Sequence, residues 1–178
     1  PLHWPLVFPE IFADHPDPGF DAIVGNPPFL GGKKISGALG NDYLAWLVRY
    51  DGAGIKGNAD LAARFVLRTQ KLLNARGQLG LICTNTLVQG DTLEVGMAQA
   101  VQRGMTVRKG LTSKPWPAAG ANLEIVEVWA SNTAVGADGE RLLDNDLVPE
   151  IGPDLQLVGR VTGPKYRLAE NNDLAFQG

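Results

Sequence analysis

FDAIVGNPPF, residues 20–29, is a short apolar run that ends in a proline turn. Residues 20–24 are typical of a buried strand, because an apolar run of this length bounded by turn residues fits a strand. Each proline fixes its own φ angle and restricts the residue before it to extended geometry, so Asn26 and Pro27 are both held by the residue that follows. The stretch therefore predicts a strand that leads directly into a stiff turn.

Beyond this turn, helical and strand patterns alternate along the chain. Asn58 is the expected N-cap of the longest helix, and Gly77 lies just beyond its expected end. Asp91 and Glu94 resemble a capping pair at the start of a later helix. The expected elements are, in order, a strand at 20–24, helices at 43–50 and 61–73, a strand at 78–84, a helix at 91–103, and strands at 106–111 and 123–130, the last two separated by a proline-rich loop at 114–117. Alternating strands and helices predict parallel strands.

Composition restricts the class of protein further. The chain has 178 residues, of which 44% are hydrophobic and 20% charged, which is typical of one soluble domain. No apolar run is long enough to cross a membrane, and residues 1–12 lack the features of an export signal. Cys83 and two histidines are too few for a structural zinc cluster, so a metal-free protein of the cytoplasm is expected.

The charge is unevenly distributed. Residues 26–129 hold twelve basic and seven acidic residues, whereas the whole chain has a net charge of -3. A basic middle segment gives modest support for a polyanionic partner such as DNA. Lysine and arginine on solvated helix faces would explain the same excess equally well.

The chemistry concentrates at the turn. In open α/β sheets ligands bind at the carboxyl ends of strands, where this turn is expected. Prolines have no N–H group, so the side-chain oxygen of Asn26 and the carbonyls of Asn26 and Pro27 form a cluster of hydrogen-bond acceptors. Such a cluster suits a group that donates two N–H bonds.

The turn resembles motif IV of the amino-methyltransferases that use S-adenosyl-L-methionine, and the form NPPF is similar to that of N6-adenine DNA methyltransferases. The resemblance extends to four further stretches, which are HWPLVFPEIF at 3–12, GQLGLICTNTLVQGD at 77–91, SKPWP at 113–117 and RLAENNDLAFQG at 167–178. Together they resemble the large adenine-specific methyltransferases of restriction-modification systems in which cutting and methylation share a polypeptide.

The resemblance implies an α/β fold: a partial Rossmann-like (class I methyltransferase) sheet with mostly parallel strands, an antiparallel last pair and flanking helices. Residues 1–130 would be the C-terminal half of the catalytic domain, matching the fourth to seventh strands of its sheet. Residues 131–178 would be an extension or linker towards a target-recognition region. The glycine-rich cofactor motif is expected upstream of Pro1, so these 178 residues are expected to be inactive alone.

The resemblance also assigns roles. Asn26, Pro27, Pro28 and Phe29 would be catalytic: Asn26 and Pro27 would accept the two N6–H bonds of adenine and contribute part of the cofactor site, and Phe29 would stack on a flipped adenine in double-stranded DNA. Lys33, Lys34 and Trp116 are candidate DNA contacts, although a solvated loop for the lysines and a loop anchor for Trp116 are the ordinary alternatives. Cys83 is expected to be inert core, and Asn85 a candidate for the rim of the pocket.

Two other functions stay open at this point. A protein-glutamine N5-methyltransferase would use the same acceptor turn, because a glutamine amide presents the same NH₂ group. A non-catalytic binding or assembly module could retain the fold alone. Without an upstream half, the strand at 20–24 would also form a sheet edge, which predicts self-association of the isolated chain.

Overall fold

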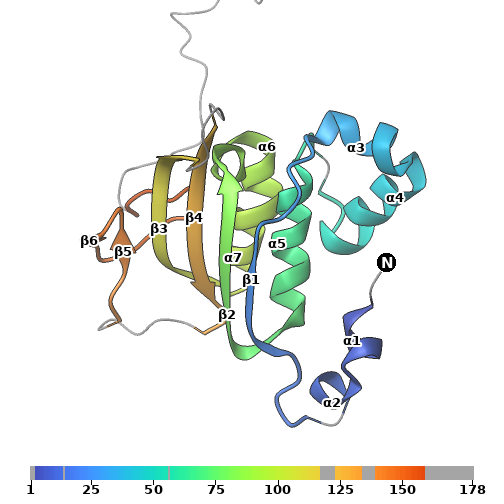
Figure 1. Ribbon diagram of the computed structural model, residues 1–178, viewed down its shortest axis with the longest axis horizontal. Coiled ribbons are helices and arrows are strands. Elements are labelled where there is room, and N and C mark those ends of the chain that lie inside the picture. The colour runs from blue at the N-terminus through green and yellow to red at the C-terminus, as the bar shows by residue number, and fades with distance from the viewer. Residues whose placement is uncertain (1–2, 14, 56, 117–122, 134–138, 159–178) are drawn as a thin grey trace, which may run out of the picture.

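A computed structural model of the chain describes residues 3–13, 15–55, 57–116, 123–133 and 139–158. Figure 1 shows a sheet with α5, α6 and α7 behind it, α3 and α4 beside its upper end, and α1 and α2 below. The elements are α1 (Trp4–Val7), α2 (Pro9–Phe12), β1 (Phe20–Gly25), α3 (Gly32–Leu39), α4 (Asn41–Trp46), η1 (Leu47–Asp51), α5 (Leu61–Leu72), β2 (Leu73–Thr84), η2 (Asn85–Val88), α6 (Gly90–Leu93), η3 (Glu94–Ala98), α7 (Gln99–Gln102), β3 (Thr106–Pro115), β4 (Glu124–Ser131), β5 (Leu142–Leu143) and β6 (Asp146–Leu147).

The described strands form one sheet in the order β1-β2-β4-β3-β5-β6. β1 is parallel to β2, and β3 is parallel to β5. β4 is antiparallel to both β2 and β3, and β6 is antiparallel to β5. Four strands therefore run in one direction, and β3 and β4 are the expected antiparallel pair. The predicted α/β fold class is confirmed.

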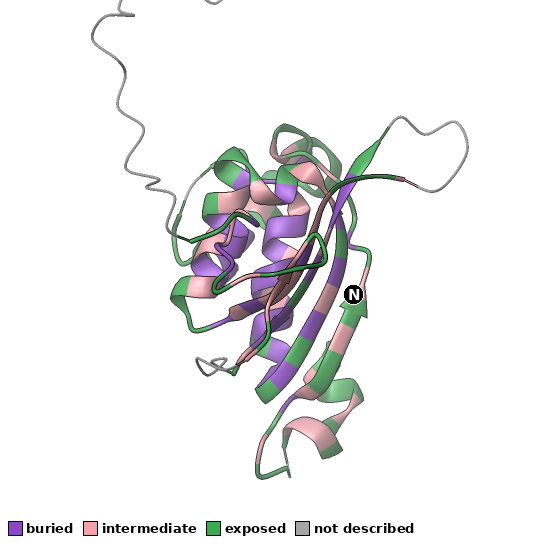
Figure 2. Ribbon diagram, turned by 90° about the vertical axis from the view of Figure 1, so that its left-hand side faces the viewer, coloured by how far each residue is buried: buried purple, intermediate pink, exposed green. Residues whose placement is uncertain are grey.

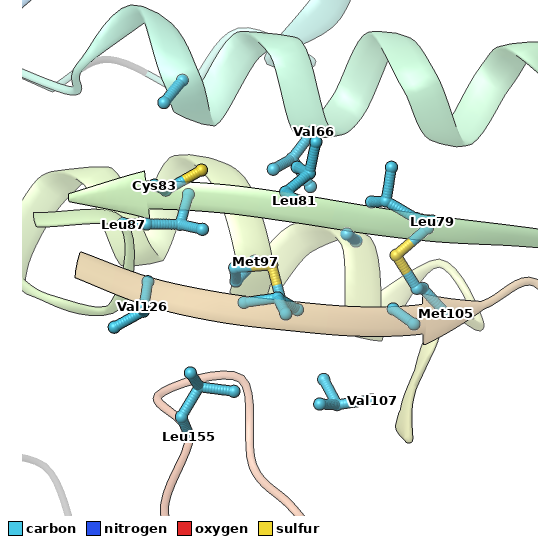
Figure 3. Packing of buried hydrophobic residues seen from close by; sticks show 14 of the residues in the cluster. Val66, Leu79, Leu81, Cys83, Leu87, Met97, Met105, Val107, Val126 and Leu155 are labelled. Atoms are coloured by element: carbon cyan, nitrogen blue, oxygen red, sulfur yellow. The ribbon is translucent and has the colours of Figure 1, made fainter. Parts of the chain in front are cut away.

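The core lies on one face of this sheet (Figure 2). Alternate residues of β2, from Leu79 to Cys83, point towards α5 and the helical segment at 90–102, and all of them are buried. Figure 3 shows Val66 of α5, Val126 of β4 and Met97 pointing into the same cluster. Strand alternation places every second side chain on the helical side, so two layers enclose one apolar core.

The other face of the sheet is covered much less in the part of the chain that the structure describes (Figure 2). Val24, Gly80, Trp129 and Lys109 lie in register across four neighbouring strands on this face. Val24 is 86% exposed, and Lys109 Nζ lies 5.0 Å from the centre of the Trp129 ring, a cation–π contact. The open face is therefore partly apolar.

Cys83 is fully buried, as expected for a core residue. Burial raises the pKa of its thiol to about 12, and the charge of Asp60 contributes to the same shift. Cys83 is consequently a neutral core side chain at physiological pH.

Several predicted boundaries are wrong, and each error has a local cause. Asp60, not Asn58, caps α5: its side chain accepts a hydrogen bond from the N–H of Ala62. The side chain of Asp91 does not cap its own helix, because it accepts a hydrogen bond from the N–H of Asn58. β2 begins at Leu73 immediately after α5, so Gly77 lies inside a strand.

Other differences concern segments that carry weak local signals. Residues 32–39 form helix α3, so Lys33 and Lys34 lie on a helix and not in a loop. β3 continues to Pro115, through the start of the predicted proline-rich loop. In the segment expected to be an extension, β5 and β6 add to the sheet, and Leu155 is part of the core cluster. The domain boundary at residue 130 remains a prediction.

None of the helices in the described ranges has the length and apolar composition needed to cross a lipid bilayer.

Gly32 is the point where α3 touches the loop before α5, and this contact gives a prediction. An added Cβ at Gly32 would lie 2.4 Å from the backbone carbon of Asn58 and 2.7 Å from the carbonyl oxygen of Ala59. At Gly37, in the same helix, an added Cβ meets nothing within 4 Å. We expect Gly32→Ala to lower the free energy of unfolding by more than about 1 kcal/mol, and Gly37→Ala to raise it by roughly 0.5–1 kcal/mol because alanine favours helix.

Urea unfolding of the two variants measures the difference. Equal stability of Gly32→Ala and Gly37→Ala would show that α3 does not pack against residues 58–59 as described.

Candidate functional site

The turn at residues 26–29 leaves the sheet at the carboxyl end of β1. Its side chains have different environments: Asn26 is exposed, Pro27 is fully buried, and the Phe29 ring is 39% exposed. Pro27 therefore fixes the turn to the body of the molecule, while the Asn26 amide and one part of the Phe29 ring remain accessible. A buried anchor between two accessible groups is an arrangement that can receive a ligand.

The end of the sheet at which β1 terminates also carries two other residues singled out from the sequence. Because β2 runs parallel to β1, Asn85 follows β2 at this edge, and Trp116 follows β3, which runs in the same direction. Asn85 Nδ2 donates to Glu124 Oε2 at 2.8 Å and to Ser113 Oγ at 3.3 Å. These bonds fix Asn85 between the ends of β3 and β4, so it has a structural role at the rim.

Trp116 and the two lysines lie at the same end of the sheet as the turn, although they belong to different parts of the fold. The Trp116 N–H donates to the carbonyl of Leu123 at 2.8 Å, which closes the end of the β3–β4 connection at the same edge as the turn. Lys33 and Lys34 are exposed in the first turn of α3, which begins three residues after Phe29 (Figure 1). All three candidate DNA contacts therefore lie at the end of the sheet where the turn lies.

The exit of the turn is bound to the start of α5. The N–H of Leu30 donates to Asp60 Oδ1 at 3.3 Å, and the N–H of Leu61 donates to the carbonyl of Leu30 at 2.9 Å. Asp60 is not among the residues predicted from the sequence to belong to the site, although an aspartate directly before an amphipathic helix is a recognised capping signal.

A groove of about 340 Å³ runs along β1 on the side of α5. Phe65 forms the wall of the groove nearest the turn. A Cβ added at Gly25, the last residue of β1, would lie 3.7 Å from its ring. The lining of the groove is mostly apolar and consists of Trp4, Phe20, Ala22, Ile23, Val24, Phe65, Arg68, Thr69 and Leu72. Only Val24 and Phe65, at one end of the groove, lie near the turn, and a flat, apolar part of a cofactor could lie at that end.

A second hollow, of about 570 Å³, lies away from the turn. It is lined by Tyr50, Gln70, Lys71, Ala75, Arg103 and Asn132. Since α5 starts beside the turn and ends at Leu72, Gln70 and Lys71 belong to the opposite end of the sheet. No group of three or more potential metal ligands occurs among the described residues.

Comparison with known proteins identifies a family for this chain. The family model described as Eco57I restriction-modification methylase matches residues 1–100, which is more than half of the chain and includes β1, the turn, α5 and β2. No curated protein matches the chain.

Of two solved structures similar to this chain, the first shows the same fold. The Type IIL restriction-modification enzyme MmeI, solved in complex with DNA, is 21% identical with a TM-score of 0.59, over 76% of this chain and 19% of that one. The M protein of the Type I restriction enzyme EcoKI is 9% identical with a TM-score of 0.42, over 74% of this chain and 24% of that one. The chain thus spans about a fifth to a quarter of the length of these structures.

The match over residues 1–100 covers the strand that carries the turn, the helix that anchors it and the strand beside it. This chain belongs to the Eco57I restriction-modification methylase family.

Proposed function

We propose that this chain carries the amino-group-binding half of a DNA adenine N6-methyltransferase that acts in a restriction-modification system, in the cytoplasm. The observation that carries the proposal is the Asn26–Phe29 turn, in which a buried proline holds an accessible amide and an accessible ring at the carboxyl end of β1. Family membership supports methyl transfer, and MmeI, which shares the fold, was solved in complex with DNA.

The chemistry follows from the acceptors. The exocyclic amine of adenine is a poor nucleophile because its lone pair is delocalised into the ring. If Asn26 Oδ1 and the Pro27 carbonyl each accept one N6–H, the nitrogen becomes more tetrahedral and its lone pair becomes available. As positive charge develops on nitrogen, these fixed dipoles stabilise it without reorganisation.

S-adenosyl-L-methionine, the methyl donor expected for this family, supplies an electrophilic methyl group on a sulfonium. With the donor bound, N6 of the target would accept this methyl group from the sulfonium, which would leave a neutral thioether, and N6 would release one proton to solvent. Asn26 and Pro27 would orient the amine, and the end of the apolar groove that Phe65 forms would receive the flat, apolar part of the donor. Other contacts to the donor would come from sequence outside these residues.

The proposed DNA contacts lie at the same end of the sheet as the turn. A flipped adenine would stack on the exposed part of the Phe29 ring, which would return roughly 1–3 kcal/mol against an extrusion cost of a few kcal/mol. Lys33 and Lys34 would contact phosphate, which positions DNA without reading its sequence. Trp116 would contact DNA beside the turn.

Asn26→Ala tests the assignment of the turn. In the full-length protein we expect it to lower kcat for methylation of duplex DNA by at least about 100-fold, because it removes one of two oriented dipoles. Asn41→Ala changes an exposed asparagine at the start of α4 and serves as the matched control. Transfer of labelled methyl groups to duplex DNA and to a glutamine-containing release-factor peptide measures both activity and substrate class.

Near-normal turnover by Asn26→Ala would remove the turn from the reaction. Labelling of the peptide and not of the DNA would favour the protein-glutamine methyltransferase, and labelling of neither substrate would favour a non-catalytic module.

Phe29 is expected to act in binding the extruded base. Phe29→Ala should weaken extrusion by about 1–3 kcal/mol, roughly 5- to 150-fold, whereas Phe29→Tyr and Phe29→Trp keep a stacking ring. Fluorescence of 2-aminopurine placed at the target position reports the extruded state. Equal fluorescence for Phe29→Ala and Phe29→Tyr would show that the ring does not stack on the base.

β1 is the edge strand of the described sheet, and this generates a prediction for the isolated chain. An apolar edge with unpaired backbone groups pairs with other chains unless it is covered. We expect concentration-dependent self-association of the 178 residues, reduced by Val24→Lys and not by Leu6→Lys, since Leu6 is an exposed apolar residue of α1 and not of the edge strand. Light scattering across a concentration series measures it, and a strictly monomeric wild-type chain would contradict it.

A further inference from the structure

Asp60 links the turn to the start of α5. Its carboxylate is 92% buried and its Oδ1 accepts two hydrogen bonds, one from the N–H of Ala62 at 2.9 Å and one from the N–H of Leu30 at 3.3 Å. The first is an ordinary helix cap. The second reaches the residue directly after Phe29, so the cap of α5 also binds the end of the turn.

Leu30 is bound from both sides. Its N–H donates to Asp60 Oδ1, and its carbonyl accepts the N–H of Leu61 at 2.9 Å. Both backbone polar groups of Leu30 therefore bind the first residues of α5. Close packing of Gly32, two residues after Leu30, against the backbone of residues 58–59 supports the same contact. The end of the turn is thus tied to the start of α5 by two hydrogen bonds.

Asp60 is itself bound by a residue of helix α6. The N–H of Asp60 donates to Thr92 Oγ1 at 3.0 Å, and Thr92 in α6 is 93% buried. The ion pair found among the described residues joins Lys71 to Asp51, and no cation there pairs with Asp60. The backbone N–H groups at the start of α5 thus provide the stabilisation of this buried carboxylate.

We propose that Asp60 is a positioning residue for methyl transfer: through Leu30 it holds Phe29, and with it the acceptors of Asn26 and Pro27, in the geometry that receives the target amine. The inference rests on the proposed function and adds to it a residue that lies outside the turn. Displacement of a reacting group by about 1 Å can cost about 100-fold in rate, so a fixed exit from the turn matters for the reaction.

The hydrogen bonds of Asp60 would also be expected if this residue served only to stabilise α5. The other end of α5 offers a matched control for this alternative. Asn132 Nδ2 donates to the carbonyls of Gln70, Leu73 and Asn74 at 3.3, 3.5 and 3.1 Å, where α5 ends. Asn132→Ala therefore removes one hydrogen bond from the last turn of α5 and two from the first residues of β2, all of them at the end of α5 away from the turn. If Asp60 only stabilises α5, Asp60→Ala and Asn132→Ala should have the same effect on turnover.

The experiment compares four variants of the full-length protein: Asp60→Ala, Asp60→Asn, Thr92→Val and Asn132→Ala. Asp60→Ala should lower kcat for DNA methylation by about 10- to 100-fold, with a smaller change in KM. Asp60→Asn keeps the Oδ1 acceptor and should recover most of the rate. Thr92→Val, which removes only the acceptor for the Asp60 N–H, should show a smaller loss in the same direction, and Asn132→Ala should keep the wild-type kcat.

Hydrogen exchange provides a readout that does not depend on activity. Asp60→Ala should accelerate amide exchange in peptides that contain residues 29–32, whereas Asn132→Ala should not. The inference is overturned if wild-type exchange is retained at residues 29–32 in Asp60→Ala, or if Asp60→Ala and Asn132→Ala lose the same fraction of kcat. Were the wild-type protein to methylate no DNA, the proposed function would fail, while faster exchange in Asp60→Ala would still establish the link between Asp60 and the turn.

Discussion

The parallel register between β1 and β2 is the constraint on which the rest of the molecule depends. Ile23 is paired with Leu79 and Gly25 with Leu81, so the apolar side of each strand faces α5. A slip of one residue would turn the buried side chains of one strand to the open face. It would also displace Asn26 along the sheet by about 3.3 Å relative to the neighbouring strand end. Burial of the core and placement of the turn are thus fixed by the same pairing.

Much of this frame could be predicted from the sequence because its signals are local. The apolar run before Asn26, the helical spacing from Leu61 to Leu72 and the apolar run to Thr84 are local signals, and the structure contains an element at each. The prediction of buried strands is wrong in one respect: β1 and β2 are buried mainly on the face towards α5, and Val24 and Ile82 on the other face are exposed. Helix α3 could not be predicted in the same way, since glycines occur at Gly32 and Gly37 and Ile35 is its one buried residue. β5 and β6 have two residues each, too few for a period to show, and they exist because β3 offers a partner.

The candidate site also combines features that follow from local sequence with features that do not. The position of the turn at a strand end follows from adjacent residues, and the shared edge with Asn85 and Trp116 follows from strand direction. The environment of Asp60 does not, because Leu30 lies 30 residues earlier and Thr92 lies 32 residues later. Asn58 has an equally good side chain for capping, and the contact of its N–H with Asp91 explains why it does not cap α5. Contacts with residues distant in the sequence therefore decide which of these two residues caps α5.

Cys83 gives this region a chemical property of its own. It is the one cysteine in these 178 residues, and burial keeps its pKa at about 12. Alkylating agents, peroxide and disulfides all react with the thiolate, which is almost absent at neutral pH for such a group. The part of the enzyme that would bind the target base therefore offers no reactive sulfur to oxidants.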